Sequence, residues 1–471
     1  KANIQNIKLI KKDIKSFLAN EDKYSKYALS IISDVLYYVL KITEEISHDI
    51  LNIDEAMKNG FGWRYGPFEL LDKIGPLYIK NIFIKSKKDI PSLLDKIVDK
   101  SFYKVQSNEI NYYDFQSNKF KILKRPDGII LLSDIKKIQK PIIKINTASL
   151  WDIGNKVTVF ELHSKSNTID MATLEFLSQS IDIVTASYES MIIYNEGELF
   201  SAGANLGEAL FLGNLGLDSE VEKNILKKGQ VVYSKLKYSN FPVIAAPANI
   251  ALGGGCEIIL HSDYVQAHIE SYIGLTEAAL GILPAWGGCK ELLFRFYNNN
   301  EIPKGPMPSI IKTFDLIGMA KVSTSAHEAK KFGYLRNSDG ITMNKNRLLY
   351  DAKQKAIKLS ENYEPPAKNT YYLPGKTAKA ALNLAINNMF ANGQISSHDK
   401  FIGEKIAYVL SGGDTDITKL IKPGNTLVVI SPPIKRNSID EINNLDKWAQ
   451  SEGYDNYADI KENGNKYHKA F

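Results

Sequence analysis

Apolar and polar residues follow different periods along the chain, and this difference divides it into parts. Over residues 1–100 apolar residues recur at helical spacing, most clearly in SKYALSIISDVLYYVLKITEEI. NIDEAMKNGFGW predicts a short helix that stops at Gly60, and a further helix is expected to begin after Pro67 and to close on Gly75. We therefore expect a small all-α domain at the start of the chain.

The period changes after residue 100. Residues 101–150 are β-rich and contain a turn signal at Pro126-Asp127-Gly128, which is typical of a connecting segment. From 151 to 422 strands such as KVTVFELH and FPVIAAPA alternate with helical stretches such as DMATLEFLSQSIDIVTAS. Strands that alternate with helices indicate an α/β domain with crossover connections. Residues 423–471 predict one strand and one helix, and we leave this tail unassigned.

Composition narrows the class of protein. Hydrophobic residues form 44% of the 471 positions, and 59 basic against 53 acidic residues give a mild net charge of +6. The lysines are scattered, which favours a solvated surface over a nucleic-acid face. No apolar run is long enough for a membrane span, and the start has no signal-peptide core. The expectation is a cytoplasmic protein without a membrane span.

The chain has no motif for a bound cofactor. It contains no dinucleotide G-x-G-x-x-G after a strand, no P-loop, no G-x-S-x-G and no H-E-x-x-H. The two cysteines, Cys256 and Cys289, lack zinc-like spacing and are interpreted as buried apolar residues. We expect neither a metal nor a redox cofactor.

Two glycine-containing turns follow apolar strands, in LFSAGAN and IALGGGCE. Small residues after a strand allow backbone N–H groups to point into a cleft, where two of them form an oxyanion hole. The helix that begins near Cys256 adds its positive dipole end. Each turn alone is equally compatible with a tight connection between a strand and a helix.

Two carboxylates stand beside these turns. Glu257 lies in the first turn of the helix after the glycines, where it could simply compensate the helix dipole. Glu277 in YIGLTEAALGILPAWGG could cap the next helix. Together the two residues predict a general acid/base pair, in which one holds a water molecule and the other transfers a proton to the neighbouring carbon.

The chain resembles known families over most of its length. FELHSKSNTID, LFSAGANL, PVIAAPANIALGGGCEIILHSDYVQAH and SYIGLTEAALGILPAWGG resemble the enoyl-CoA hydratase/isomerase (crotonase) superfamily. TASLWDIGNKV and HSKSNTID are similar to the multifunctional fatty-oxidation proteins. IDEAMKNGFGWRYGPFELLDKIG resembles the C-terminal helical domain of 3-hydroxyacyl-CoA dehydrogenases. Since the nucleotide-binding domain of those enzymes has no counterpart in this sequence, we expect no NAD site and no dehydrogenase activity from this chain alone.

The resemblance implies a fold and a site. The fold would be the crotonase-like ββα spiral with C-terminal helices. Ala202 and Gly254 would donate the oxyanion-hole N–H groups, and Gly203 and Gly253 would line the substrate site. Glu257 and Glu277 would be the catalytic pair that hydrates trans-2-enoyl-CoA to 3-hydroxyacyl-CoA in fatty-acid β-oxidation, with coenzyme A as part of the substrate.

Other interpretations remain open at this point. The domain could catalyse enoyl-CoA isomerisation, or it could be a non-catalytic acyl-CoA-binding or assembly module. The family implies a homo-oligomer or an association with dehydrogenase or thiolase components as possible states. Trp286 replaces a residue that is often small in relatives, so it either narrows the acyl pocket or packs outward.

Overall fold

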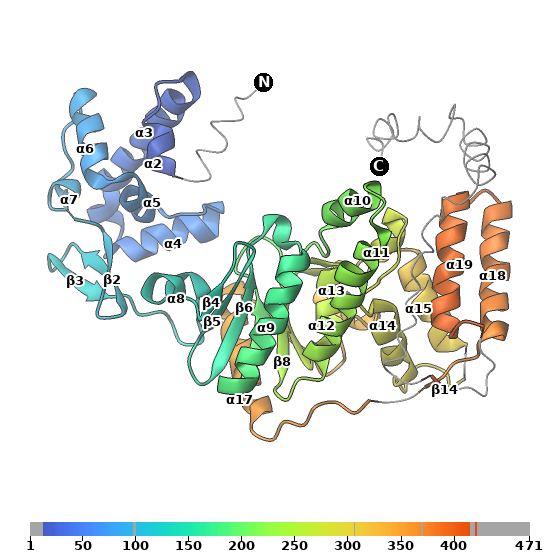
Figure 1. Cartoon of the computed structure of the whole chain (residues 1–471). Coiled ribbons are helices and arrows are strands. Elements are labelled where there is room, and N and C mark those ends of the chain that lie inside the picture. The colour runs from blue at the N-terminus through green and yellow to red at the C-terminus, as the bar shows by residue number, and fades with distance from the viewer. Residues whose placement is uncertain (1–12, 98–99, 306, 369–370, 415–419, 422–471) are drawn as a thin grey trace. The chain divides into compact units, whose positions relative to one another are not determined.

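The computed structural model describes residues 13–97, 100–305, 307–368, 371–414 and 420–421 (Figure 1). The chain divides into two compact units. The first contains the described residues up to Ile142, with Trp151–Ile153 and Asn346–Asp351. The second contains Ile143–Leu150, Gly154–Lys345 and the described residues from Ala352 onward.

The first unit packs helices around an apolar core and adds a small antiparallel sheet. Leu36, Phe68, Leu71 and Phe83 are fully buried in this core. The strand order is β1-β2-β3. Its elements are α2 (Ile14–Leu18), α3 (Lys23–Ile46), α4 (Ile50–Phe61), α5 (Pro67–Ile74), α6 (Pro76–Lys85), α7 (Ser92–Asp95), β1 (Tyr103–Gln106), β2 (Glu109–Asp114), β3 (Lys119–Ile122) and α8 (Leu132–Ile138).

The end of α4 differs from the prediction. The helix continues through Gly60 and ends at Gly62, whose φ of 67° is the left-handed conformation that a glycine adopts without strain. The expected stop at Gly60 is therefore wrong by two residues. The predicted start after Pro67 and end at Gly75 are confirmed for α5.

The second unit is built on a mixed seven-stranded sheet in the order β12-β10-β8-β7-β6-β5-β4. The pairs from β6 through β12 are parallel, and β4 pairs with β5 in the antiparallel direction. This sheet between helices confirms the predicted α/β class. Its strands are β4 (Ile143–Lys144), β5 (Ala148–Asp152), β6 (Val157–Leu162), β7 (Ser190–Tyr194), β8 (Val243–Ala246), β10 (Tyr264–His268) and β12 (Gly340–Thr342).

Two short strands form a separate parallel pair, β9 (Asn249–Leu252) and β11 (Ser271–Gly274). The pairing places Leu252 opposite Gly274. Since the strands are parallel, the chain leaves both of them at the same edge. The glycine turn and the segment that leads to Glu277 therefore begin side by side.

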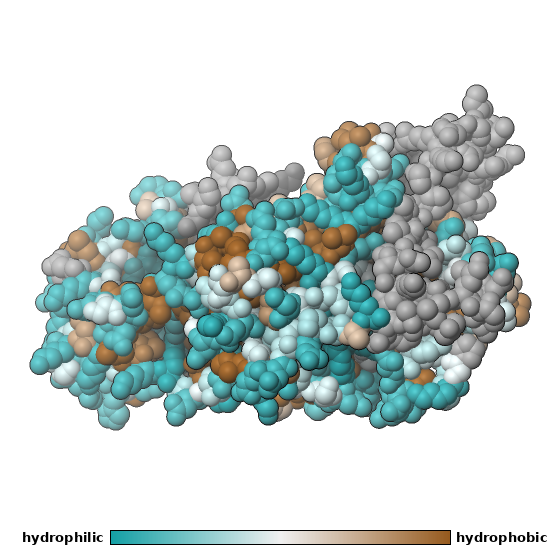
Figure 2. Space-filling view, turned by 60° about the horizontal axis from the view of Figure 1, so that its bottom comes forward, coloured by the Kyte–Doolittle hydropathy of each residue, from teal (hydrophilic) through white to brown (hydrophobic). Residues whose placement is uncertain are grey.

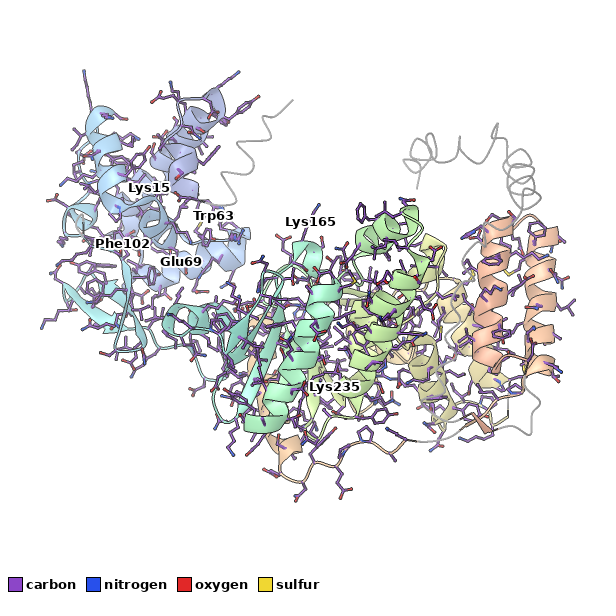
Figure 3. The ribbon with its side chains drawn as sticks, in the orientation of Figure 1. Lys15, Trp63, Glu69, Phe102, Lys165 and Lys235 are labelled. Carbon is purple, nitrogen blue, oxygen red and sulfur yellow. The ribbon has the colours of Figure 1, made fainter. Side chains whose placement is uncertain are left out.

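Helices connect and cover these strands. In Figure 1, α9 and α12 pack beside each other, as do α18 and α19 near the end of the described chain. Figure 3 labels Lys235 of α12, whose ammonium group donates to the Ser178 carbonyl and pairs with Asp182 of α9. The helical elements are η1 (Lys165–Asn167), α9 (Met171–Ser187), α10 (Leu206–Asn214), α11 (Asp218–Glu220), η2 (Val221–Lys227), α12 (Lys228–Lys237), α13 (Gly254–His261), η3 (Glu277–Leu280), α14 (Gly288–Tyr297), α15 (Pro308–Gly318), α16 (Ala326–Lys331), η4 (Lys345–Arg347), α17 (Leu348–Ser360), α18 (Lys376–Ala391) and α19 (Ser397–Ser411).

The face shown in Figure 2 is mostly hydrophilic, with separate apolar patches. Leu210 and Phe211 of α10 are among the exposed large apolar residues. Within the described segments, no helix combines the length and the hydropathy that crossing a bilayer requires. The strand and helix predicted for residues 423–471 lie outside the described residues. Two further short strands, β13 (Tyr371–Tyr372) and β14 (Leu420–Ile421), pair with each other in the antiparallel direction.

Candidate active site

Three segments meet where β9 and β11 end. The bridge between Ser201 and Ala251 holds the turn after β7 against β9. The Leu252–Gly274 pairing then holds the glycine turn beside the chain that enters η3. The predicted residues of all three segments are thus neighbours, although 75 positions separate Ala202 from Glu277 along the sequence.

Close backbone contact explains the glycines. Gly253 has φ of 51° and ψ of −123°, a conformation that favours glycine. A Cβ on Gly203 would lie 2.9 Å from the Leu252 carbonyl oxygen and 3.0 Å from the Gly254 nitrogen. No larger residue fits at Gly203 unless one of the two turns moves. The two predicted substrate-lining glycines, Gly203 and Gly253, therefore shape the backbone at this point.

The structure changes one of the two predicted N–H donors. The Ala202 N–H donates to the Ser166 carbonyl at 3.1 Å, so it is not available to a ligand. The Ala204 nitrogen instead lies 3.3 Å from the position that a Cβ on Gly254 would take. Among the described residues, no acceptor is assigned to the N–H of Ala204 or of Gly254. Ala204 therefore replaces Ala202 as the candidate partner of Gly254.

Glu257 lies one turn into α13, and its side chain is held by a backbone turn. The residue is only 2% exposed. Its Oε1 accepts hydrogen bonds from the Trp286 N–H at 2.9 Å and from the Gly288 N–H at 2.8 Å. Burial raises the pKa of the Glu257 carboxyl above its usual value, and these two N–H donors lower it in part.

Glu277 opens η3 on the other side of the glycine turn. Its Oε1 lies 3.2 Å from the position of a Cβ on Gly253, and the residue is 8% exposed. Among the described atoms, its Oε2 has no hydrogen-bond partner. Burial raises the pKa of Glu277, and the neighbouring charge of Glu257 raises it further. The two carboxyls thus form a buried pair in which ionisation of one disfavours ionisation of the other.

Two aromatic residues contact backbone carbonyls of α13, and sequence reasoning missed both. His261 Nδ1 lies 2.7 Å from the Glu257 carbonyl oxygen, and the Tyr233 hydroxyl donates to the Gly254 carbonyl at 2.9 Å. Burial lowers the pKa of His261 to about 4, so its ring is neutral at pH 7. The spacing of four residues between Glu257 and His261 on one helix was the available signal. Nothing near Tyr233 in the sequence pointed to Gly254.

The cysteines are not reactive groups at this site. Cys256 and Cys289 are free thiols, and both side chains are buried. Burial raises the pKa of each thiol above its usual value, so both stay protonated at neutral pH. Across the described part of the chain, no group of three or more His, Cys, Asp or Glu residues is placed to hold a metal ion.

Comparison with known protein families assigns this region. Residues 152–296, which contain Ala204, Gly254, Glu257 and Glu277, match the family model described as enoyl-CoA hydratase/isomerase. The chain carries a domain of the enoyl-CoA hydratase/isomerase family. Residues 30–108 match a second model, the C-terminal domain of 3-hydroxyacyl-CoA dehydrogenase. Both matches confirm the family resemblance seen in the sequence.

Curated relatives combine the same two regions with further sequence. A Bacillus subtilis protein named "Probable 3-hydroxyacyl-CoA dehydrogenase" is 37% identical over 408 residues, which cover 86% of this chain and 51% of that protein. A Rickettsia felis protein with the provisional name of a fatty acid oxidation complex trifunctional enzyme is 28% identical over 386 residues, or 82% of this chain and 48% of its own. The chain thus spans about half the length of these relatives.

Solved structures give a weaker comparison. An enoyl-CoA hydratase from Bacillus anthracis is 25% identical and covers 56% of this chain and 90% of its own, with a TM-score of 0.36. An enoyl-CoA hydratase from Bacillus halodurans is 19% identical, covers 57% and 94%, and has a TM-score of 0.40. The family assignment rests on the sequence matches.

The hydratase/isomerase domain also contains a cavity of about 450 Å³. Its wall includes Lys237, His261, Glu291, Arg295 and Arg336, but neither catalytic candidate. In this wall the ammonium group of Lys237 forms an ion pair with Glu291, and Arg295 donates to backbone carbonyls. We therefore place the candidate chemistry at the glycine turn and not in this cavity.

Proposed function

We propose that this domain hydrates trans-2-enoyl-CoA thioesters to 3-hydroxyacyl-CoA. The observation that carries the proposal is a buried pair of carboxyls, Glu257 and Glu277, beside two backbone N–H groups to which no acceptor is assigned. Addition of water to an activated double bond needs those parts: a group that takes a proton, a group that gives one, and donors for the charge that develops on the carbonyl oxygen.

The N–H groups of Ala204 and Gly254 would hold the thioester oxygen. In the addition step negative charge moves onto this oxygen, and two donors about 3 Å away stabilise it most when the charge is fully developed. Gly254 is the first residue of α13, so its N–H has no acceptor within the helix. The glycines at 203 and 253 allow the two donors to lie this close together.

The different surroundings of the two carboxyls support different roles for them. Glu257 accepts two N–H groups, which favour its ionised form, so it would take the proton from water as the oxygen bonds to C3. Glu277 has the more strongly raised pKa and would give its proton to C2. The water oxygen and its remaining hydrogen end on C3, and the proton from Glu277 ends on C2. Proton exchange with solvent then restores both carboxyls.

The names of the relatives support a place in fatty-acid β-oxidation. The Rickettsia felis relative is named for a fatty acid oxidation complex, and the Bacillus subtilis relative for 3-hydroxyacyl-CoA dehydrogenation. A 3-hydroxyacyl-CoA is the product of the hydration that we propose. We therefore propose that this domain supplies such a product for oxidation at C3.

The test uses crotonyl-CoA and follows the loss of absorbance of the conjugated enoyl thioester. The parent chain should hydrate it, and mass spectrometry should find a 3-hydroxyacyl product, which an isomerase would not form. Glu277→Gln should lower kcat by about 10²–10⁴-fold. The exposed Glu270→Gln is the matched control and should leave kcat unchanged. Absence of turnover in the folded parent chain would refute the proposal.

A further inference from the structure

Trp286 lies inside the candidate site, although its position in PAWGG left an outward orientation open. The residue is 3% exposed. Its Nε1 donates to the Ile225 carbonyl at 3.0 Å, and its ring meets the Tyr233 ring edge-on at a centroid distance of 5.3 Å. The indole is therefore fixed by a hydrogen bond at one end and by aromatic packing at its side.

The six-membered part of the indole lies directly against Gly254. A Cβ on Gly254 would be 2.7 Å from Trp286 Cζ3 and 3.0 Å from Cε3. The same residue contacts the catalytic pair through its backbone, because its N–H donates to Glu257 Oε1 at 2.9 Å. Trp286 thus borders both the proposed oxyanion donor and the proposed base.

Helix α12 leaves room for the indole at Gly229. A Cβ on Gly229 would lie 2.1 Å from Trp286 Nε1, so only glycine leaves room for the ring at this position. A glycine inside a helix is destabilising relative to alanine, so its presence here needs a packing reason. One turn later, the Tyr233 hydroxyl donates to the Gly254 carbonyl. The ring therefore contacts both η2 and α12, and a change of its rotamer would break these contacts.

We propose that Trp286 closes the acyl pocket and makes the domain selective for short-chain enoyl thioesters. The proposal rests on the proposed function. With the thioester oxygen at Ala204 and Gly254 and the reacting carbons between the two carboxyls, an acyl chain that continues past C3 must pass the indole. Because protein interiors are close-packed, each methylene that meets a fixed ring lowers kcat/KM by about 10–200-fold.

The experiment measures kcat/KM for crotonyl-, octenoyl- and dodecenoyl-CoA. The parent chain should prefer crotonyl-CoA over dodecenoyl-CoA by at least about tenfold. Trp286→Ala should reduce or reverse this ratio, because it opens the space beside Gly254 while the backbone N–H to Glu257 stays. Phe296→Ala removes a buried aromatic ring elsewhere in the domain and should leave the ratio unchanged.

Several outcomes would overturn the inference. A parent chain that hydrates dodecenoyl-CoA as efficiently as crotonyl-CoA excludes it without any variant. A folded Trp286→Ala that keeps the parent ratio also excludes it. If no thioester is hydrated, the proposed function fails, and calorimetric titration with butyryl- and dodecanoyl-CoA tests the inference separately. Equal affinity of the parent chain for both ligands would then refute it, and a preference for butyryl-CoA that Trp286→Ala abolishes would support it.

Discussion

The backbone N–H of Trp286 donates to Oε1 of Glu257 at 2.9 Å, and this contact joins the PAWGG turn to helix α13. The Gly288 N–H adds a second donor to the same oxygen at 2.8 Å. One oxygen of Glu257 is therefore positioned by two backbone N–H groups. Substitutions of Glu257 can therefore separate its role as a hydrogen-bond acceptor from its role in proton transfer.

Glu257→Gln keeps an acceptor for both N–H groups but cannot take a proton. We expect kcat to fall by about 10²–10⁴-fold with little change in thermal stability. Glu257→Ala also leaves two buried donors without an acceptor, which costs roughly 1–3 kcal/mol for each. Crotonyl-CoA turnover and urea unfolding of both variants measure the two effects. Equal destabilisation by Gln and Ala would contradict the positioning role of the two donors.

The pH profile should report the paired carboxyls. Burial raises the pKa of Glu257 to about 7 and that of Glu277 to about 8. The proposed base must be ionised and the proposed acid protonated, so kcat/KM should rise with pH through the lower value and fall above the higher one. Stopped-flow rates from about pH 5 to about pH 10 measure this bell shape. A rate that is flat across this range would exclude the pair as acid and base.

The same shift should appear in the stability of the fold. The pKa of Glu277 is raised in the folded chain from its usual value of 4.5, so the folded state binds more protons than the unfolded state over this interval. The free energy of unfolding should therefore fall as the pH rises from the usual value to about 8. Glu277→Gln removes this contribution, and its melting temperature should decline less than that of the parent chain across the same range. Parallel curves for the two proteins would contradict the shift.

Much of the site could be predicted because its residues lie in short turns. Glycines after apolar strands predicted the close approach of the backbone. Glu257 follows the GGG turn directly, and Glu277 comes shortly after Gly274 at the end of β11. The choice between Ala202 and Ala204 could not be made in this way. It depends on the Ser166 carbonyl, which accepts the hydrogen bond of the Ala202 N–H. Ser166 lies more than thirty residues earlier in the sequence.

The remaining misses also depend on contacts across the fold. Gly60 and Gly62 are equally good helix ends by composition, and the conformation of Gly62 decides between them. The orientation of Trp286 depends on the space that Gly229 leaves in α12, far away in the sequence. The π-helix η2 runs directly into α12, and helical periodicity in the sequence does not distinguish the two kinds of helix. Such choices follow from packing and not from local propensity.

Gly203→Ala should disturb the proposed oxyanion donors directly. Its φ of 94° disfavours alanine, and the new Cβ would lie 3.0 Å from the Gly254 nitrogen. Loss of one oxyanion donor lowers kcat by about 10²–10³-fold, and we expect a decrease of this order on crotonyl-CoA. Gly213→Ala in α10 is the matched control, since its Cβ would have room and its helical backbone accepts alanine. A Gly203→Ala variant with parental kcat would show that this turn does not set the donor geometry.

Asp54 should stabilise the first unit through buried hydrogen bonds, whose loss would lower the free energy of unfolding. It is 1% exposed, and its carboxylate accepts the Phe68 N–H at 2.8 Å, the Glu69 N–H at 3.2 Å and the Tyr103 hydroxyl at 2.7 Å. It thereby caps α5, the helix that contains Glu69, and ties it to β1; Figure 3 labels Glu69 within this unit.

Asp54→Ala leaves these donors without an acceptor, and we expect a loss of roughly 1–3 kcal/mol for each buried donor, seen as a lower urea midpoint. Asp95→Ala is the control, because its carboxylate is 64% exposed and pairs only with Lys80 among the ion pairs of the described residues. Such a surface pair contributes about 0–1 kcal/mol, so its midpoint should barely move. Asp54→Asn should fall between the two, since it keeps an acceptor oxygen. Equal midpoints for Asp54→Ala and Asp95→Ala would show that the buried carboxylate does not hold α5 and β1 together.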